Sequence, residues 1–527
     1  MSLSRRDVLK LAAFGGAAML WPTQRLARAA GDPFRNRLPQ SRLPRPFTVP
    51  YRQPPVALPV RSTADADYFR ITMAPALVEI VPGLQTPMYA YNGTVPGPTF
   101  ASTRGKPIVV RFVNTLPAKD EALGYDQWTS VHLHGSPSLP QFDGYASDIT
   151  LPGQYKDYHY PNTPTARTLW YHDHGAHHTA ENVYQGLFGM HKLRDPAEDA
   201  LGLPTGEFDL PIVISDIMLQ ADGKVLFTLA EDNGMYGDII CVNGRPWPAL
   251  KVKRRKYRFR VLNGSVSRSY NLSLSSGDSF QMIATDGGLM PSPQTVKSFR
   301  HSMGERYEIV VDFARYDPGK RIVLQNDSPK NNQKFPNIDV VMAFDVVDDA
   351  FDPSNNDVPS KLNPDHETML LNESDAVKTR QVELIRTKGQ WTVNRVTWQQ
   401  IIDSNFKLTL ARPEVGATEI WEVSTQGGGW FHPFHIHFVD FLVLSRNGQP
   451  AFAFERGPKD VMYVGENEKV RLLTRFDAPG KYMLHCHNAV HEDHDMMTQY
   501  EIVKNGVSVG NDPFSARAID LPEATPL

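Results

Sequence analysis

The 527-residue sequence predicts an all-β protein made of three consecutive Greek-key β-barrel or sandwich domains. Its length is too great for one hydrophobic core. Proline (42 residues) and glycine (37 residues) recur throughout, as expected for many short strands joined by turns. Several segments alternate between polar and apolar residues and are rich in β-branched and aromatic side chains, which is the period of strands and not of helices.

A weak internal repeat divides the chain into three parts. Three motifs with a central asparagine stand at equal intervals: Tyr91-Asn92-Gly93, Val242-Asn243-Gly244 and Val393-Asn394-Arg395. Each precedes a strand-like segment, at residues 108–113, 257–261 and 419–423. Polar stretches near 196–206 and 346–370 are the expected linkers. The predicted domains are therefore residues 45–195, 206–348 and 371–505.

Residues 1–30 are typical of a twin-arginine export signal. Arg5-Arg6 is followed by a weakly apolar run at residues 11–21 and by a small-residue cleavage site, Ala27-Arg28-Ala29. The alternative is a membrane anchor, but the run is shorter than the roughly 20 residues that a spanning helix needs. We expect a protein that is exported, to the periplasm or beyond, without stable membrane insertion.

Charge and cysteine content limit the possible binding partners and the roles of the two cysteines. The net charge is −3, so the composition predicts no basic surface for nucleic acid or an anionic membrane. The two cysteines, Cys241 and Cys486, would favour a disulfide in an exported protein. The histidines beside Cys486 indicate a metal ligand instead, so we expect no intrachain disulfide and a buried, apolar role for Cys241.

Histidines indicate the chemistry. Four His-x-His pairs occur where chance would give roughly half a pair. Residues i and i+2 of a strand point to the same face, so each pair offers two adjacent imidazoles to copper, zinc, iron or nickel. Two pairs fall in the first predicted domain and two in the third, which predicts one eight-histidine cluster, shared by two or three ions, where these domains meet. The pairs are His132/His134, His172/His174, His435/His437 and His485/His487.

A second ligand set lies beside the last pair. Two histidines and a cysteine with a weak axial methionine form a blue-copper electron-transfer site. The four residues are His432, Cys486, His491 and Met496. Side chains alternate along a strand, so Cys486 should face away from His485 and His487. Segment 485–487 would therefore join the two sites.

A zinc hydrolase is the main alternative for so many histidines. Only two residues separate His491 from His494, so this segment is not His-Glu-x-x-His. Zinc also has no redox use for a site with cysteine and methionine. The remaining histidines are expected to be structural, among them His177, His178, His191, His301 and His494.

With these motifs the sequence resembles the three-domain multicopper oxidases over nearly all of the chain after the export signal. The signatures are HLHG at 132–135, HDHG at 172–175, HPFHIH at 432–437 and HCHNAVHEDHDMM at 485–497. It is most similar to the bilirubin oxidases and bacterial spore-coat laccases, through residues 429–432 and 491–497. The resemblance implies three cupredoxin-like domains and four copper ions.

The resemblance also assigns ligands to copper types. It implies one type 1 copper bound by His432, Cys486, His491 and Met496, and one type 2 copper bound by His132 and His435. It implies two type 3 coppers bound by His134, His172, His174, His437, His485 and His487. The implied reaction couples four one-electron oxidations of a phenolic, aromatic or bilirubin-like substrate to reduction of O2 to water.

Oxygen reduction consumes four protons, so acids should line the cluster. Asp143 follows HLHG, and Glu492 is adjacent to His491. Both match carboxylates assigned to proton delivery in similar enzymes. The alternative is that they only hydrogen-bond ligand imidazoles and fix their tautomers.

Other functions compete with this one. A metallo-oxidase for copper(I) or manganese(II) is the alternative among enzymes, although the 16 methionines are scattered, which disfavours specialised copper(I) oxidation. A non-catalytic binding or division factor is disfavoured because every ligand is retained, and a two-domain nitrite reductase would lack four His-x-His pairs. We expect a monomer whose partners are O2 and a small-molecule or metal-ion donor. Trp430, Phe431 and Phe434 flank His432; such aromatics more often pack in the core, and the alternative is an apolar docking edge for a phenol or tetrapyrrole.

Overall fold

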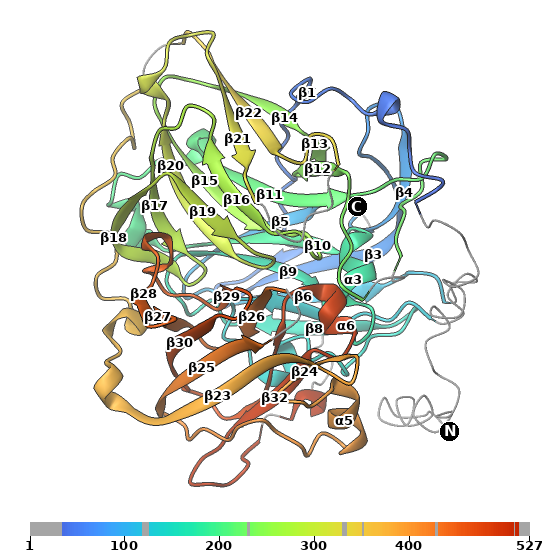
Figure 1. The fold of residues 1–527 in the computed structure, drawn as a ribbon, viewed down its shortest axis with the longest axis vertical. Coiled ribbons are helices and arrows are strands. Elements are labelled where there is room, and N and C mark those ends of the chain that lie inside the picture. The colour runs from blue at the N-terminus through green and yellow to red at the C-terminus, as the bar shows by residue number, and fades with distance from the viewer. Residues whose placement is uncertain are drawn as a thin grey trace.

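The computed structural model describes residues 34–118, 126–228, 232–328, 335–349, 352–426, 430–510 and 512–515. The predicted export signal lies outside these residues. Within the described part, no helix is long and apolar enough to cross a membrane. Six β-sheets make three sandwiches in chain order, and helices are few and short (Figure 1). The all-β, three-domain prediction is confirmed, whereas the bounds given above for each domain stay predictions.

The first sandwich packs a five-stranded sheet on a four-stranded one around Phe69, Phe112 and Tyr171. The first sheet contains β2 (Arg61–Ser62), β3 (Asp67–Glu79), β4 (Gln85–Tyr91), β6 (Ile108–Asn114) and β8 (Tyr155–Tyr160). The second contains β5 (Gly97–Thr103), β7 (Val131–His134), β9 (Arg167–Asp173) and β10 (Phe188–Arg194). The short helices are η1 (Gln40–Arg42), η2 (Pro140–Phe142), α3 (Thr179–Tyr184) and α4 (Pro196–Asp199).

The second sandwich is the largest and provides most of the main hydrophobic core. Its seven-stranded sheet contains β11 (Asp209–Ile217), β12 (Ile239–Val242), β13 (Arg245–Pro246), β15 (Lys256–Asn263), β17 (Phe280–Thr285), β18 (Gly288–Val296) and β20 (Arg306–Asp312). Its six-stranded sheet contains β1 (Val49–Pro50), β14 (Pro248–Val252), β16 (Tyr270–Leu274), β19 (Ser298–His301), β21 (Arg321–Asn326) and β22 (Val340–Val346). The short helices are η3 (Gly206–Phe208) and η4 (Phe313–Arg315).

The third sandwich encloses Trp421, Phe441 and Tyr500. Its six-stranded sheet contains β23 (Ala376–Thr387), β24 (Gln390–Val393), β25 (Thr418–Gln426), β27 (Phe441–Arg446), β28 (Gln449–Pro450) and β30 (Lys469–Arg475). Its four-stranded sheet contains β26 (His432–Ile436), β29 (Val461–Val464), β31 (Gly480–Cys486) and β32 (Met497–Ile502). The helices are η5 (Glu367–Leu370), η6 (Glu373–Asp375), α5 (Trp398–Asp403), η7 (Ala453–Glu455), α6 (Ala489–Asp493) and η8 (Pro513–Ser515).

The sequence repeat is a repeated turn. Asn92, Asn243 and Asn394 all adopt a left-handed conformation, with φ of 48°, 51° and 49°. The side-chain oxygen of each accepts a backbone N–H from the strand paired with the one that leads into the turn, at 2.8, 2.9 and 2.6 Å. In every domain the strand that donates this N–H also pairs in parallel with a later strand, as β3 with β6, β11 with β15, and β23 with β25. The three strand-like segments of the sequence are confirmed as β6, β15 and β25.

Side chains of β15 alternate between the hydrophobic core and the opposite face of the sheet. Phe259 and Val261 enter the core, while Arg258 and Arg260 point to the other face. Those arginines are also buried, with 2% and 6% of their surface exposed, because that face lies against other parts of the chain. Arg260 forms ion pairs with Asp209 and Glu308 of its own domain, and it also donates to the Thr168 hydroxyl of β9 at 3.1 Å. This buried hydrogen bond joins the first sandwich to the second.

We predict that Asn243→Ala lowers the free energy of unfolding by about 2–4 kcal/mol, because it leaves the buried Val213 N–H unpaired and puts alanine in a left-handed conformation. Urea denaturation followed by circular dichroism measures this. Asn92→Ala is the matched control at an exposed position, where water replaces the lost bond, and Asn243→Gly removes the bond without the backbone strain. Equal losses in Asn243→Ala and Asn92→Ala would contradict the prediction.

Candidate metal centres

Four strands bring the eight predicted histidines together. In the first domain, β7 and β9 run antiparallel, and His132 stands directly opposite His172. In the third domain, β26 and β31 place His435 directly opposite His485. The two-residue period then sets the second histidine of each pair on the same face of its strand or just beyond the strand end.

These two sets face each other across the contact between the first and third domains. The rings of His132 and His437 lie with centroids 4.0 Å apart, and those of His134 and His435 stack at 3.8 Å. Each of the eight side chains is at most 4% exposed. The predicted cluster at this interface is therefore present, and water is nearly excluded from it.

The ligand nitrogens of the eight histidines form three groups, two of which share His134, and the atoms of each group lie within 4.8 Å of one another. Three groups match the three ions that the resemblance implies. They are His132, His134 and His435; His134, His172 and His487; and His174, His437 and His485.

Hydrogen bonds decide which nitrogen of each ring faces inward. The Nδ1 atoms of His132, His172 and His435 lie 2.5, 2.8 and 2.7 Å from backbone carbonyl oxygens, so Nδ1–H donates outward. Their Nε2 atoms are buried and have no hydrogen-bond partner among the described residues. Burial also holds the pKa of His172 and His435 well below the ordinary value. Buried, neutral nitrogens without partners fit a metal ion, which would supply the missing contact.

His134 is oriented the opposite way. Its Nε2 donates to Asp460 Oδ1 at 2.9 Å, and its Nδ1 lies 3.2 Å from His487 Nε2. The remaining Nε2 atoms meet other ligands, since His485 Nε2 lies 3.2 Å from His174 Nε2 and 3.1 Å from His437 Nε2. Seven of the eight rings thus present Nε2 to the cluster, and His134 alone presents Nδ1.

The second predicted site is also assembled. Cys486 Sγ lies 3.3 Å from His432 Nδ1 and 3.6 Å from His491 Nδ1, and those two nitrogens are 3.2 Å apart. Met496 is fully buried in the same core as Cys486, and its carbonyl accepts the Cys486 N–H at 3.1 Å. Burial raises the pKa of the Cys486 thiol, so the thiolate that a copper needs would itself depend on the bound cation.

Strand parity separates the two sites as predicted. Cys486 joins His432 and His491, whereas His485 and His487 join two different groups of the histidine cluster. Just beyond β31, Asn488 caps α6 by accepting the Val490 N–H at 3.2 Å. The cap starts a helix that returns His491 to Cys486 after only one turn.

The indole of Trp391 covers the second site, although no motif in the sequence predicts this contact. It stacks on the His491 ring with centroids 4.1 Å apart and planes inclined by 27°. Trp430 is half-buried and meets the same ring edge-on. Phe431 and Phe434 are only 3% and 0% exposed, so the aromatic edge predicted around His432 reduces to Trp430.

Both predicted carboxylates touch ligand histidines. Asp143 Oδ2 accepts from His437 Nδ1 at 2.8 Å, and burial raises the pKa of Asp143. Glu492 Oε2 lies 3.0 Å from His485 Nδ1, and Oε1 lies 3.5 Å from His174 Nδ1. Burial would raise the pKa of Glu492, but His485 and His174 outweigh it and hold the value at about 2.

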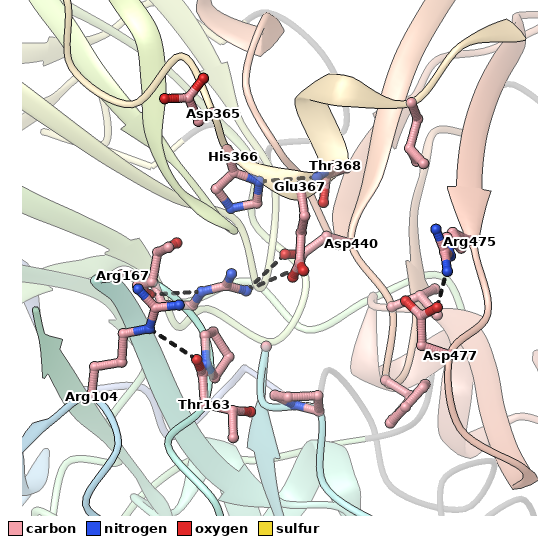
Figure 2. Close-up of a pocket in the computed structure, with 17 residues that line it drawn as sticks. Arg104, Thr163, Arg167, Asp365, His366, Glu367, Thr368, Asp440, Arg475 and Asp477 are labelled. Atoms are coloured by element: carbon pink, nitrogen blue, oxygen red, sulfur yellow. Dashed lines mark hydrogen bonds and ion pairs between the residues drawn. The ribbon is translucent and has the colours of Figure 1, made fainter. Parts of the chain in front are cut away.

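A charged cleft of about 600 Å³ lies beside the cluster (Figure 2). It reaches Gly135 and Phe438, which directly follow two of the eight histidines in the sequence. Arg167 of the first domain and Asp440 of the third meet in its wall at 2.9 Å. The remaining charged lining residues are Arg104, Asp365, Glu367, Arg475 and Asp477. Such a lining suits water and small polar molecules, and it does not match a bulky apolar donor.

Cys241, His191 and His301 have structural roles, as the sequence predicts. Cys241 and Cys486 are both free, and Cys241 is 1% exposed within the main core. His191 lies 2.5 Å from Ser102 Oγ, and His301 bonds to the Glu305 carbonyl at 2.8 Å. Neither belongs to a group of metal-ligating side chains among the described residues.

Comparison with known proteins agrees with this geometry. Sequence models of the multicopper oxidase family match residues 73–198, 209–340 and 343–506. A bilirubin oxidase of Albifimbria verrucaria is 42% identical over 480 residues, which cover 86% of this chain and 81% of that protein. A laccase of Bacillus subtilis (strain 168) is 32% identical over 508 residues, which cover 85% and 97%. A multi-copper oxidase from Pediococcus acidilactici has a TM-score of 0.78 at 28% identity, covering 89% and 94%.

We predict that Cys486→Ser abolishes the blue absorption, because a hydroxyl cannot replace the copper–thiolate bond, while the cluster still binds about three copper ions. Metal analysis and visible spectroscopy of the copper-loaded variant measure both. Cys241→Ser, the same change at a buried cysteine away from the metal centres, should keep the colour. A blue Cys486→Ser protein would contradict the assignment.

Proposed function

We propose that this chain, which belongs to the multicopper oxidase family, takes single electrons from a donor at one copper and delivers four of them to dioxygen at a three-copper cluster. Segment 485–487 carries the proposal, because Cys486 is a ligand candidate of the first site and both of its neighbours are candidates of the second. Copper would supply the one-electron chemistry at both sites. The protein separates the place where a donor reacts from the buried place where oxygen reacts.

The proposed ligand assignment follows the observed groups. His432, Cys486, His491 and Met496 would hold the type 1 copper. His132 and His435 would hold the type 2 copper, each through Nε2. The type 3 pair would be held by His134, His172 and His487 on one side and by His174, His437 and His485 on the other. Zinc remains a poor candidate, because a thiolate and thioether site has no redox use for it.

An organic donor is proposed over a metal ion. Of the proteins that resemble this chain, one is named for the oxidation of bilirubin, an organic donor, and another is a laccase. Around the first site the structure presents the indoles of Trp391 and Trp430 against His491. The described groups of metal-ligating side chains all belong to the proposed copper sites, so none is left there for a donor ion. Trp391 is 2% exposed and Trp430 is half-buried, so Trp430 is the ring that a planar apolar donor would contact.

Proton supply is assigned to Asp143. It combines a raised pKa with a direct hydrogen bond to His437, so it can hold a proton next to the cluster. Glu492 is held in its charged form between His485 and His174, where Thr179 also donates to it at 2.9 Å. We propose that Glu492 mainly orients these two rings and that protons enter through the charged cleft.

The proposal includes export by the twin-arginine route and a monomeric enzyme. Arg5-Arg6 and the weakly apolar run after it support export, and this route carries proteins that are already folded. A folded chain can load copper before it crosses the membrane, which suits ligand sets that come from two domains.

The function is tested by counting copper and measuring oxygen uptake. The loaded protein should hold about four copper ions, one of them blue. It should consume oxygen with bilirubin or phenols faster than with copper(I) or manganese(II). The reverse order would favour a metallo-oxidase. Fewer than four ions, or no uptake with any donor, would contradict the proposal.

We further predict that Asp143→Asn keeps the copper and the blue colour but slows oxygen reduction by about 100-fold or more, the usual loss for a missing general acid. Asparagine can still accept the His437 N–H, so orientation alone would be preserved. Stopped-flow reoxidation of the reduced enzyme measures the step, and anaerobic bleaching by the donor is the control that should not change. Unchanged reoxidation would rule out the proton role.

A further inference from the structure

We propose that the second domain, which supplies none of the twelve ligand candidates, orients two of them through a buried Arg306–Asp460 pair. This inference rests on the four-copper function proposed above. It makes Arg306 and Asp460 positioning residues for the cluster. Neither would touch a copper ion, and both would act through His134 and His435.

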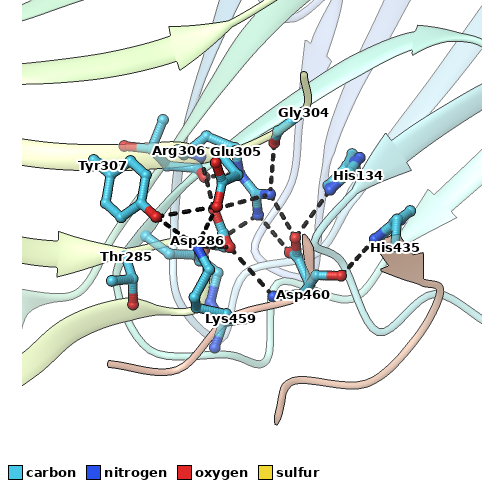
Figure 3. Close-up of polar contacts among 12 residues, drawn as sticks. His134, Thr285, Asp286, Gly304, Glu305, Arg306, Tyr307, His435, Lys459 and Asp460 are labelled. Carbon is cyan, nitrogen blue, oxygen red and sulfur yellow. Dashed lines mark hydrogen bonds and ion pairs between the residues drawn. The ribbon is translucent and has the colours of Figure 1, made fainter. Parts of the chain in front are cut away.

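Arg306 lies where all three domains meet, at the start of β20 (Figure 3). Its Nε–H donates to the Thr168 carbonyl of the first domain at 3.0 Å. Within the second domain it donates to the carbonyls of Gly304 and Asp286 at 3.1 and 3.2 Å. Its two remaining N–H groups donate to the two Asp460 oxygens of the third domain, at 2.6 and 2.5 Å. All five donors are used, so the guanidinium has one allowed orientation.

Asp460 transmits this orientation to two ligands. Its Oδ1 accepts the Nε2–H of His134 at 2.9 Å, and its backbone carbonyl accepts the Nδ1–H of His435 at 2.7 Å. The first bond leaves Nδ1 of His134 facing the cluster, and the second leaves Nε2 of His435 facing it. A single residue therefore sets the tautomers of two rings that stack on each other at 3.8 Å.

The reversed ring of His134 follows from this carboxylate. Neighbouring rings such as His132 and His172 bond Nδ1 to carbonyl oxygens near in sequence or space and present Nε2. His134 has a carboxylate at Nε2 instead, supplied by a domain other than its own. A carboxylate that accepts the proton of a ligand imidazole makes the opposite nitrogen a stronger metal ligand.

The charges of the buried network around Arg306 also fit a carboxylate at His134. Lys459 donates to Asp286, Glu305 and the Tyr307 hydroxyl at 2.8, 3.1 and 3.1 Å, so its ammonium is also fully used. The network has two cationic and three carboxylic side chains, all at most 1% exposed. Lys459 is shared between Asp286 and Glu305, whereas Asp460 pairs with Arg306. The carboxylate that accepts from His134 therefore has a cationic partner on its other side, which compensates its charge in the buried site.

The backbone next to His134 is shaped around the pair. Gly135 has φ of +86°, and a Cβ there would lie 2.4 Å from an Arg306 terminal nitrogen and 2.8 Å from Asp460 Oδ2. Only glycine leaves room for the pair to reach the residue after the ligand. This contact is independent of the hydrogen bonds and also ties Arg306 and Asp460 to the position of His134.

Arg260 provides a matched control for burial and domain contact. It also joins the second domain to Thr168 of the first and is 6% exposed. Its acidic partners are Glu308, two residues after Arg306 on β20, and Asp209. It bonds to no histidine of the cluster. A loss caused only by weakening the interface should therefore appear equally in Arg260→Met and Arg306→Met.

The test compares copper retention in full-length Asp460→Asn, Arg306→Met and Arg260→Met. Apoprotein loaded with copper is dialysed against graded chelator, copper per chain is counted, and blue absorption reports the type 1 ion separately. Asp460→Asn has nearly the shape of the original residue, so it tests the charge even where Arg306→Met folds poorly. Unfolding midpoints of the three apoproteins measure any general loss of stability.

We expect Asp460→Asn and Arg306→Met to keep the blue copper while the cluster loses about 10–100-fold in affinity, the usual effect of removing a partner of a ligand histidine. The share of copper visible by electron paramagnetic resonance should also rise, because His134 serves one ion of the coupled pair. Arg260→Met should resemble the unmodified protein in both respects. Unchanged copper retention in Asp460→Asn, or an equal loss of copper in Arg260→Met, would overturn the positioning role of Arg306 and Asp460 but not the proposed function. An unmodified protein that binds no cluster copper would overturn the proposed function as well.

Discussion

Burying eight neutral imidazoles together is the constraint on which the rest of this structure depends. Each ring has two nitrogens that need partners, and water is nearly excluded from the contact between the first and third domains. Carbonyl oxygens take one nitrogen of rings such as His132, His172 and His435. The inward nitrogens are left for metal ions. The metal site therefore forms only where the first and third domains are in contact, and neither domain can complete it alone.

The sequence predicts those parts of the site that depend on the alternation of side chains along a strand, and it does not predict the parts that depend on contacts between distant segments. Residues two apart on a strand share a face, so the four pairs and the separation of Cys486 from His485 follow from spacing alone. Asn92 and its two counterparts are likewise visible because a left-handed turn favours asparagine. The three-domain order could be predicted from these signals, whereas the pairing of sheets depends on contacts between segments far apart in the chain.

Residues that contact the cluster from another domain are not marked by strand periodicity or by a turn motif. Asp460 and Arg306 are separated by 154 positions in the chain, and neither stands in a motif. Trp391 reaches His491 by folding of β24 against the third-domain core, which no sequence period specifies. The second domain supplies no ligand candidate in the sequence, so its support for the cluster can be recognised only in the folded structure. Core packing, which the sequence favours for the aromatics beside His432, holds for Phe431 and Phe434 but not for the half-buried Trp430, because proximity in sequence does not decide which rings the core encloses.

The short path between the two sites has a consequence for how donors can be chosen. In the proposed reaction electrons would pass from Cys486 to its two neighbours through covalent bonds, so donor oxidation and oxygen reduction would take place at separate sites. The half-buried Trp430 at the edge of the first site could then meet a different donor without disturbing the ligands behind it. The reverse does not hold for the cluster, where Asp143, Glu492 and Asp460 each bond to more than one essential group. Selection for a new donor should therefore act on the rim of the first site, while the three-domain contact behind it stays fixed.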